Sequence, residues 1–125
     1  MITIDYRSRV PIYDQITGGI IRLKTMGVLS PGDKLPSVRS LALELGINPN
    51  TVQKAYAILE NDGVIVSISG KGSFISEDAS ATDAIVSAAK EEFKKAVSEA
   101  KRMGLQKEEL HRILDSLYEG GNFDD

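Results

Sequence analysis

Amide, hydroxyl and amine side chains gather in one short stretch of the chain, between residues 48 and 54. The stretch contains Asn48, Asn50, Thr51, Gln53 and Lys54. Asn and Gln can pair with adenine, the Thr methyl group can contact thymine, and free N–H groups at the start of a helix can hold a phosphate. This chemistry suits the edges and backbone of duplex DNA. The same residues would also make an ordinary polar helix face, so the elements around them decide between the two interpretations.

Two short helices joined by a tight turn are predicted around this stretch. Ser37 offers a hydroxyl for the start of the first helix, and Gly46 stands where a left-handed residue usually ends one. Asn48 can cap the second helix, and Pro49 suits its first position, where a missing N–H costs nothing. Residues 61–63, Asn-Asp-Gly, are expected to close this helix.

A β-hairpin is predicted directly after the second helix. The β-branched run VIVSIS can form one strand, SGKG a tight turn, and SFIS the return strand. Two helices followed by a hairpin is the layout of a winged helix-turn-helix, whose second helix enters the major groove. Lys71, between Gly70 and Gly72, would then lie at the tip of the wing. It could merely keep the tip soluble, but glycines also let a backbone approach phosphate closely.

The segments before the helix pair are predicted to complete the core. Residues 2–6 could form a brief strand or an extended arm. A helix is expected from Pro11 to near Gly27, and the pair at 18–19, Gly-Gly, indicates either close packing of another backbone or a weak point. The turn at 31–32 should deliver Leu35 to the core.

The last third of the chain is predicted to be a separate helical segment. After a polar linker, in which Ser80 and Asp83 have the spacing of a capping box, one long amphipathic helix is expected over 84–103, and Gly104 ends it. A second helix follows. So short a helix pair rarely stands alone, so its apolar stripes are expected to pair two copies. The predicted dimerisation residues are Ile85, Ala89, Phe93, Ala96, Ala100, Leu110, Ile113, Leu114 and Leu117.

Composition narrows the classes of function. The 125 residues include no Cys and one His, His111, so disulfide, thiol and metal chemistry are not expected, and neither is a cofactor. No apolar run could span a membrane and no secretory signal is visible, which predicts a cytoplasmic protein. The carboxylates at 91–92 and 108–109 are best explained as solvated or paired charges, and no catalytic motif indicates an enzyme.

The net charge of −3 argues against binding nucleic acid by bulk positive charge. Its distribution is uneven, however. Residues 1–76 hold eight Lys and Arg against six Asp and Glu, whereas residues 77–125 hold seven against twelve. A slightly basic head can face DNA while the acidic part faces away, because screening confines each field to about 8–10 Å. The alternative hypothesis is a winged-helix module that binds proteins and not DNA.

Three runs of residues, in order, resemble the GntR family of winged-helix transcription regulators. They are PIYDQI, then LSPGDKLPSVRSLALELGINPNTVQKAYAILENDGVI, then SGKGSFI, and together they span roughly residues 3–76. The short remainder is similar to the YtrA-like branch. The resemblance implies a winged helix-turn-helix DNA-binding domain at 1–76 and a dimerisation or effector segment at 77–125. It also implies a homodimer on a palindromic operator, usually a repressor, often of transport-related genes.

The resemblance further implies which residues contact DNA. Arg39 matches an arginine that contacts DNA from the helix before the recognition helix. The full set of predicted DNA-contact residues is Ser37, Arg39, Asn48, Pro49, Asn50, Thr51, Gln53, Lys54, Gly70, Lys71 and Gly72. Pro49 and Gln53 replace arginines of other branches, so the guanine contacts of those arginines do not transfer. Any small-molecule effector is expected at the dimer interface or between the two parts.

Overall fold

The computed structural model describes residues 2–120; Met1 and residues 121–125 lie outside the described part. The chain divides into two compact units, unit 1 (Met1–Ala84) and unit 2 (Ile85–Asp125). Helices predominate, and one antiparallel hairpin accompanies them, which confirms the predicted fold class. The elements are α1 (Ile12–Thr25), α2 (Val38–Leu45), α3 (Pro49–Asn61), β1 (Ile65–Ile68), β2 (Gly72–Ile75), α4 (Ser80–Arg102) and α5 (Lys107–Tyr118).

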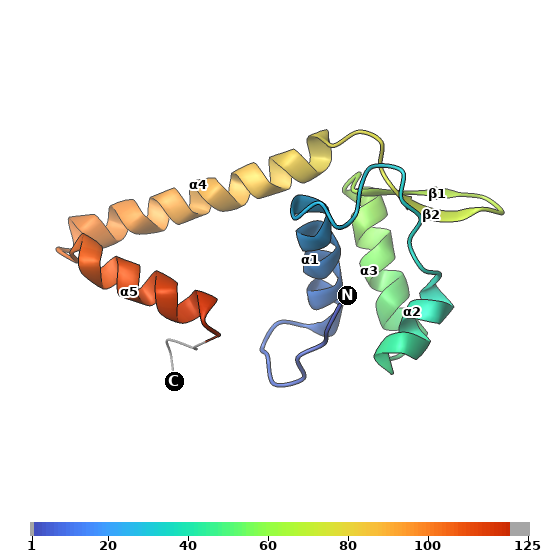
Figure 1. Ribbon diagram of the computed structural model, residues 1–125, viewed down its shortest axis with the longest axis horizontal. Coiled ribbons are helices and arrows are strands. Elements are labelled where there is room, and N and C mark those ends of the chain that lie inside the picture. The colour runs from blue at the N-terminus through green and yellow to red at the C-terminus, as the bar shows by residue number, and fades with distance from the viewer. Residues whose placement is uncertain (1, 121–125) are drawn as a thin grey trace. The chain divides into compact units, whose positions relative to one another are not determined.

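Helices α1, α2 and α3 and the hairpin form unit 1 (Figure 1), and buried apolar side chains make a core between them. Ile16 of α1 and Val52 of α3 are fully buried in this core, and Ile20 of α1 and Leu59 of α3 are each 1% exposed. The helices predicted in these two segments are therefore confirmed. Leu35 is buried as expected, at 3% exposure. Each fully buried aliphatic side chain contributes about 1.5–3 kcal/mol of transfer free energy, so this core can hold unit 1 together.

The ends of α2 and α3 are fixed by local hydrogen bonds, as the sequence predicts. The Ser37 hydroxyl accepts a bond of 3.0 Å from the Ser40 N–H, and Gly46 ends α2 with a left-handed φ of 67°. The Asn48 side chain accepts a bond of 2.8 Å from the Asn50 N–H, and Pro49 is the first residue of α3. These caps satisfy backbone groups that a helix leaves open at its termini. They fix where the second helix begins.

The start of α4 differs from the prediction. Ser80 was expected to cap this helix, but it is the first helical residue, and its own N–H bonds to the Asp78 side chain. An Asp78 side-chain oxygen accepts a bond of 2.9 Å from the Ser80 N–H, and this bond lowers the pKa of the Asp78 carboxyl. The prediction of Ser80 as the cap was wrong because Asp and Ser are both good N-cap residues and stand two positions apart here.

The hairpin has a third, short partner. Strands β1 and β2 pair antiparallel, with Ile65 opposite Ile75. The segment before α2 then pairs with the other edge of β2: the Leu35 N–H donates to the Ser73 carbonyl at 2.8 Å, and the Ile75 N–H donates to the Asp33 carbonyl at 2.8 Å. The sequence predicts the extended segment but not this pairing, which ties the base of the wing to the start of α2.

The N-terminal residues form an extended arm, not a strand. The Gln15 side-chain amide holds the arm, because it donates to the carbonyls of Asp5 and Val10, at 2.9 Å each. Ile2 packs on α1 at Gly19, where an added Cβ would lie 3.4 Å from the Ile2 side chain. The neighbour of the glycine pair is therefore a side chain at Gly19 and not the predicted backbone, and an added Cβ at Gly18 would meet nothing within 4 Å.

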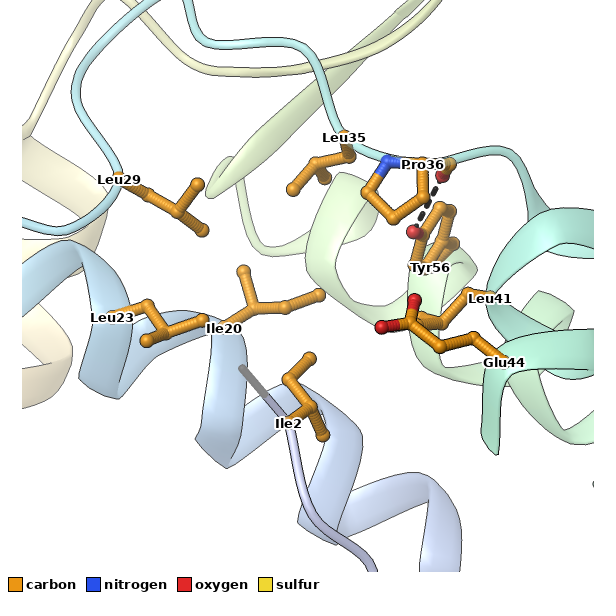
Figure 2. A pocket seen from close by; sticks show the side chains of 9 residues that line it. All are labelled: Ile2, Ile20, Leu23, Leu29, Leu35, Pro36, Leu41, Glu44 and Tyr56. Carbon is orange, nitrogen blue, oxygen red and sulfur yellow. Dashed lines mark hydrogen bonds between the residues drawn. The ribbon is translucent and has the colours of Figure 1, made fainter. Parts of the chain in front are cut away.

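A small cavity lies under this arm, between Ile2, Leu35 and Tyr56 (Figure 2). Its volume is about 20 Å³, which is room for about one water molecule. The lining is mostly aliphatic. We therefore regard this cavity as a packing gap and not as a site for a metabolite.

Unit 2 contains α5 and most of α4, and it leaves much of its apolar surface exposed. Phe93 is 58% exposed and Leu117 is 53% exposed. The two helices share an apolar groove of about 360 Å³. All the predicted dimerisation residues except Ile85 and Ala89 line it, and His111 lies beside them.

The charged side chains of α4 pair within the helix. Glu91 pairs with Lys94, Glu92 with Lys95, and Glu99 with Arg102, all on exposed surface. Pairs of this kind stabilise a helix by only a few tenths of a kcal/mol. They account for two of the four carboxylates that the sequence singled out. Within residues 2–120, no helix is both long and apolar enough to cross a bilayer.

Candidate nucleic-acid interface

One face of α3 is open to solvent. Asn50, Gln53, Lys54 and Ala57 are all exposed, and they recur at intervals of three and four residues, as one side of a helix requires. The opposite side, which includes Val52, is buried in the core. The polar residues that the sequence singled out therefore point outward together. Ala57 was missed; its place four residues after Gln53 is the signal that could have found it.

The first turn of α3 has a structural role as well. The Asn48 oxygen is occupied by the Asn50 N–H, which leaves the Asn48 amide nitrogen as a donor. Asn48 and Pro49 are exposed, and Thr51 is half-buried. Capping alone thus explains Asn48 and Pro49, and any contact to DNA would be additional. The open N–H groups of this turn also favour a phosphate.

The start of α2 is fixed against α3. The Tyr56 hydroxyl donates a hydrogen bond of 2.7 Å to the Pro36 carbonyl, one residue before the Ser37 cap (Figure 2). Burial, and to a lesser degree the Glu44 carboxylate, raises the pKa of Tyr56 to about 12, so its hydroxyl keeps its proton at neutral pH. Arg39, in the first turn of α2, is exposed. This bond holds the start of α2 in place against α3, so the backbone at Arg39 has a fixed position relative to α3.

The wing and the start of α2 form the two sides of a recess. It has a volume of about 530 Å³, and its lining includes Ser37, Lys34 and the hairpin turn with Lys71. The Lys71 N–H donates to the Ile68 carbonyl at 2.9 Å and closes the turn, in which Gly70 has a φ of 75°. The Ser37 hydroxyl also bonds to the Ser40 hydroxyl, so capping occupies it.

Lys34 belongs to this recess although the sequence did not single it out. Its side chain crosses Gly72, where an added Cβ would lie 3.1 Å from Lys34 Cε, at a glycine φ of 116°. The pairing of residues 33–35 with β2 brings it there. No local pattern could have found Lys34, because its neighbours in the recess are some forty residues away in the chain.

The basic side chains at the recess and in the first turn of α2 keep their charge available. In the part of the chain that the structure describes, the ion pairs are those within α4. Lys34, Arg39 and Lys71 are exposed and have no carboxylate within 4.0 Å among these residues. The two lysines that line the recess, and Arg39 in the first turn of α2, can each bind phosphate. Lys54 differs, because its amine lies over the ring of Tyr13, 3.9 Å from the ring centre.

No group of three or more His, Asp or Glu side chains among residues 2–120 could hold a metal ion. The arrangement thus consists of an exposed polar helix face, a basic recess and a hairpin with a glycine-lined tip.

Known proteins are similar to this chain in sequence and in fold. The model of the bacterial regulatory proteins of the gntR family matches residues 12–75. The transcriptional repressor YtrA of Bacillus subtilis is 43% identical over 119 residues, covering 94% of this chain and 92% of that protein. The crystal structure of a transcriptional antiterminator from Listeria monocytogenes aligns with a TM-score of 0.74 at 35% identity, covering 94% of this chain and 90% of that one.

Part of the chain is also similar to a domain that was solved in complex with DNA. The DNA-binding domain of AraR, solved in complex with its operator ORX1, aligns with a TM-score of 0.53 at 27% identity, covering 58% of this chain and 90% of that one. Such relatives favour DNA binding over a protein-binding module. The chain belongs to the GntR family, is similar to YtrA along most of its length, and is a transcription regulator with a DNA-binding winged helix-turn-helix.

Proposed function

We propose that the chain is a cytoplasmic repressor that binds a palindromic operator as a homodimer. Each protomer places the exposed face of α3 in the major groove, with Asn50 and Gln53 toward base edges. Arg39, Lys34 and Lys71 hold the phosphates on the recess side. The observation that carries this proposal is the geometry of unit 1, in which one fixed unit presents the polar helix face and the unpaired cations.

The dimer would be built from unit 2. Its apolar groove of about 360 Å³ and its exposed Phe93 and Leu117 form an apolar surface of the kind that a protein partner covers. We therefore assign the groove to the second copy and not to an effector. A two-fold pair of α3 helices about 34 Å apart would match one turn of DNA and a palindromic site.

Selection from random duplexes by the full chain, followed by sequencing, tests the proposal. A palindrome with half-sites about one turn apart is expected. Arg39→Ala and Lys71→Ala should each weaken binding to the selected duplex by about tenfold. Each should also make the negative slope of log K against log salt shallower by about 0.9.

Lys24→Ala is the matched control, because it removes one positive charge from the last turn of α1 in the same unit. Its affinity and salt slope should stay close to those of the wild type. Selection that enriches no sequence, or Arg39→Ala and Lys71→Ala variants that bind like Lys24→Ala, would overturn the proposed function.

A further inference from the structure

Lys54 has an aromatic neighbour in place of an acidic one. Its amine lies 3.9 Å from the centre of the Tyr13 ring, and no described carboxylate lies within 4.0 Å of it. Tyr13 is the second residue of α1 and is half-buried, whereas Lys54 is exposed on the face of α3 that carries Asn50 and Gln53. The pair therefore lies at the edge of the proposed contact face, where α1 flanks α3.

A ring in this position restricts lysine without neutralising it. An amine over an aromatic face is attracted to the negative ring surface, but it keeps its full charge and can still donate hydrogen bonds away from the ring. A long lysine side chain otherwise loses much of its rotamer freedom when it binds a phosphate. A carboxylate partner would hold the side chain equally well but would compete with the phosphate. The aromatic partner holds it and leaves the charge for the ligand.

Tyr13 also has a fixed base. It lies next to Ile12, and the helix continues through the fully buried Ile16 and the nearly buried Ile20, which anchor α1 against the core. Gln15, two residues on, ties the N-terminal arm to the same end of α1. The ring therefore cannot follow the lysine freely, and the lysine is the member of the pair that is positioned.

We propose that Tyr13 is a positioning residue for DNA binding, which holds the Lys54 amine ready for a backbone phosphate beside the major groove. This inference rests on the proposed function. It adds a phosphate contact where α1 flanks α3, whereas the contacts proposed above come from the recess beside the wing. Tyr13 acts through Lys54 and need not touch DNA itself.

A double-mutant cycle on the full chain tests the proposal with the operator duplex selected above. Tyr13→Leu removes the ring, Tyr13→Phe keeps it, Lys54→Gln removes the charge, and Tyr13→Leu/Lys54→Gln does both. Tyr13→Leu is expected to weaken operator binding by about two- to fivefold, the usual size of an exposed contact of this kind. Tyr13→Phe should restore wild-type affinity. In the Lys54→Gln background, Tyr13→Leu should have no further effect.

The salt slope separates positioning from simple stabilisation. Lys54→Gln should make the negative slope of log K against log salt shallower by about 0.9. Tyr13→Leu should leave this slope unchanged because the charge of Lys54 is still present. Lys24→Gln is the matched control for charge, and thermal unfolding of each variant checks that unit 1 remains folded at the assay temperature. Additive effects of the two substitutions, a gain of affinity in Tyr13→Leu, or loss in Tyr13→Phe equal to that in Tyr13→Leu would overturn the proposal.

The failure of this inference can be told apart from the failure of the proposed function. If Arg39→Ala and Lys71→Ala weaken binding as expected while Lys54→Gln does not, the proposed function stands and the role of Tyr13 falls. If the wild type selects no operator, the proposed function itself falls.

Discussion

The two units of the chain place their apolar residues in opposite ways. Unit 1 buries them: Ile16, Val52 and Ala55 are wholly inaccessible to solvent. Unit 2, over its described residues, has no buried apolar side chain, and Phe93 and Leu117 are more than half exposed. A unit with its own core can position side chains against a ligand. A unit without one is stable chiefly through what covers it. The contrast supports our proposal that unit 1 contacts DNA and that unit 2 pairs two copies of the chain.

The largest expected effect is a loss of stability in the core of unit 1, which we compare with a substitution in unit 2. Ile16→Ala should lower the free energy of unfolding by about 2–5 kcal/mol, because it leaves a cavity in a closed core. Urea denaturation at several protein concentrations measures it, and the loss should be the same at each. Leu117→Ala is the comparison from unit 2, and its effect should vary with concentration. Equal and concentration-independent losses would remove the distinction between the units.

A charge on the apolar face of unit 2 should separate the protomers. Phe93→Glu places a carboxylate at the proposed interface, and it is expected to weaken dimerisation by about 2–4 kcal/mol, as loss of an interface anchor does. Sedimentation equilibrium measures the dissociation constant. Ser98→Glu, at an exposed position of the same helix off the apolar stripe, is the control and should remain dimeric. A monomeric wild type, or a dimeric Phe93→Glu variant, would contradict the assignment of this face.

Alkaline pH should weaken unit 1 through Tyr56. Its pKa is about 12 in the folded chain against an ordinary value of 10.0, so the unfolded chain loses this proton first. The contribution is present below pH 10 and is lost as pH rises from about 10 to about 12, with a loss of up to about 2 kcal/mol. Urea denaturation between pH 9 and 11 measures it, with Tyr56→Phe as the reference. If both proteins lose stability equally over this range, Tyr56 is not responsible.

The smallest expected effect separates capping from DNA contact at Asn48. Asn48→Ala should lower the free energy of unfolding by about 1 kcal/mol, because α3 loses its cap. Asn48→Asp keeps a capping oxygen, so it should unfold like the wild type, but its charge should weaken operator binding through repulsion from phosphate. Thermal unfolding and operator titration measure the two effects. An Asn48→Asp variant that binds as tightly as the wild type would limit Asn48 to its structural role.

The sequence by itself determined the local features of this protein. The caps at Ser37 and Asn48, the left-handed Gly46 and the hairpin turn around Lys71 all depend on bonds between residues a few positions apart, so a short window of sequence contains each signal. The family resemblance extended these signals to a function. The predicted contact residues and the predicted dimer face remain predictions that the experiments above can test.

Only the tertiary structure decided which distant residues meet. The pairing of Lys34 with β2, the bond from Tyr56 to Pro36 and the contact between Lys54 and Tyr13 join segments twenty to forty residues apart. Their positions follow from how three helices pack around one core, and that packing depends on all the core residues at once. A local sequence pattern predicts the helix or strand in which a residue lies. It does not predict which distant residue will contact it once the core has packed.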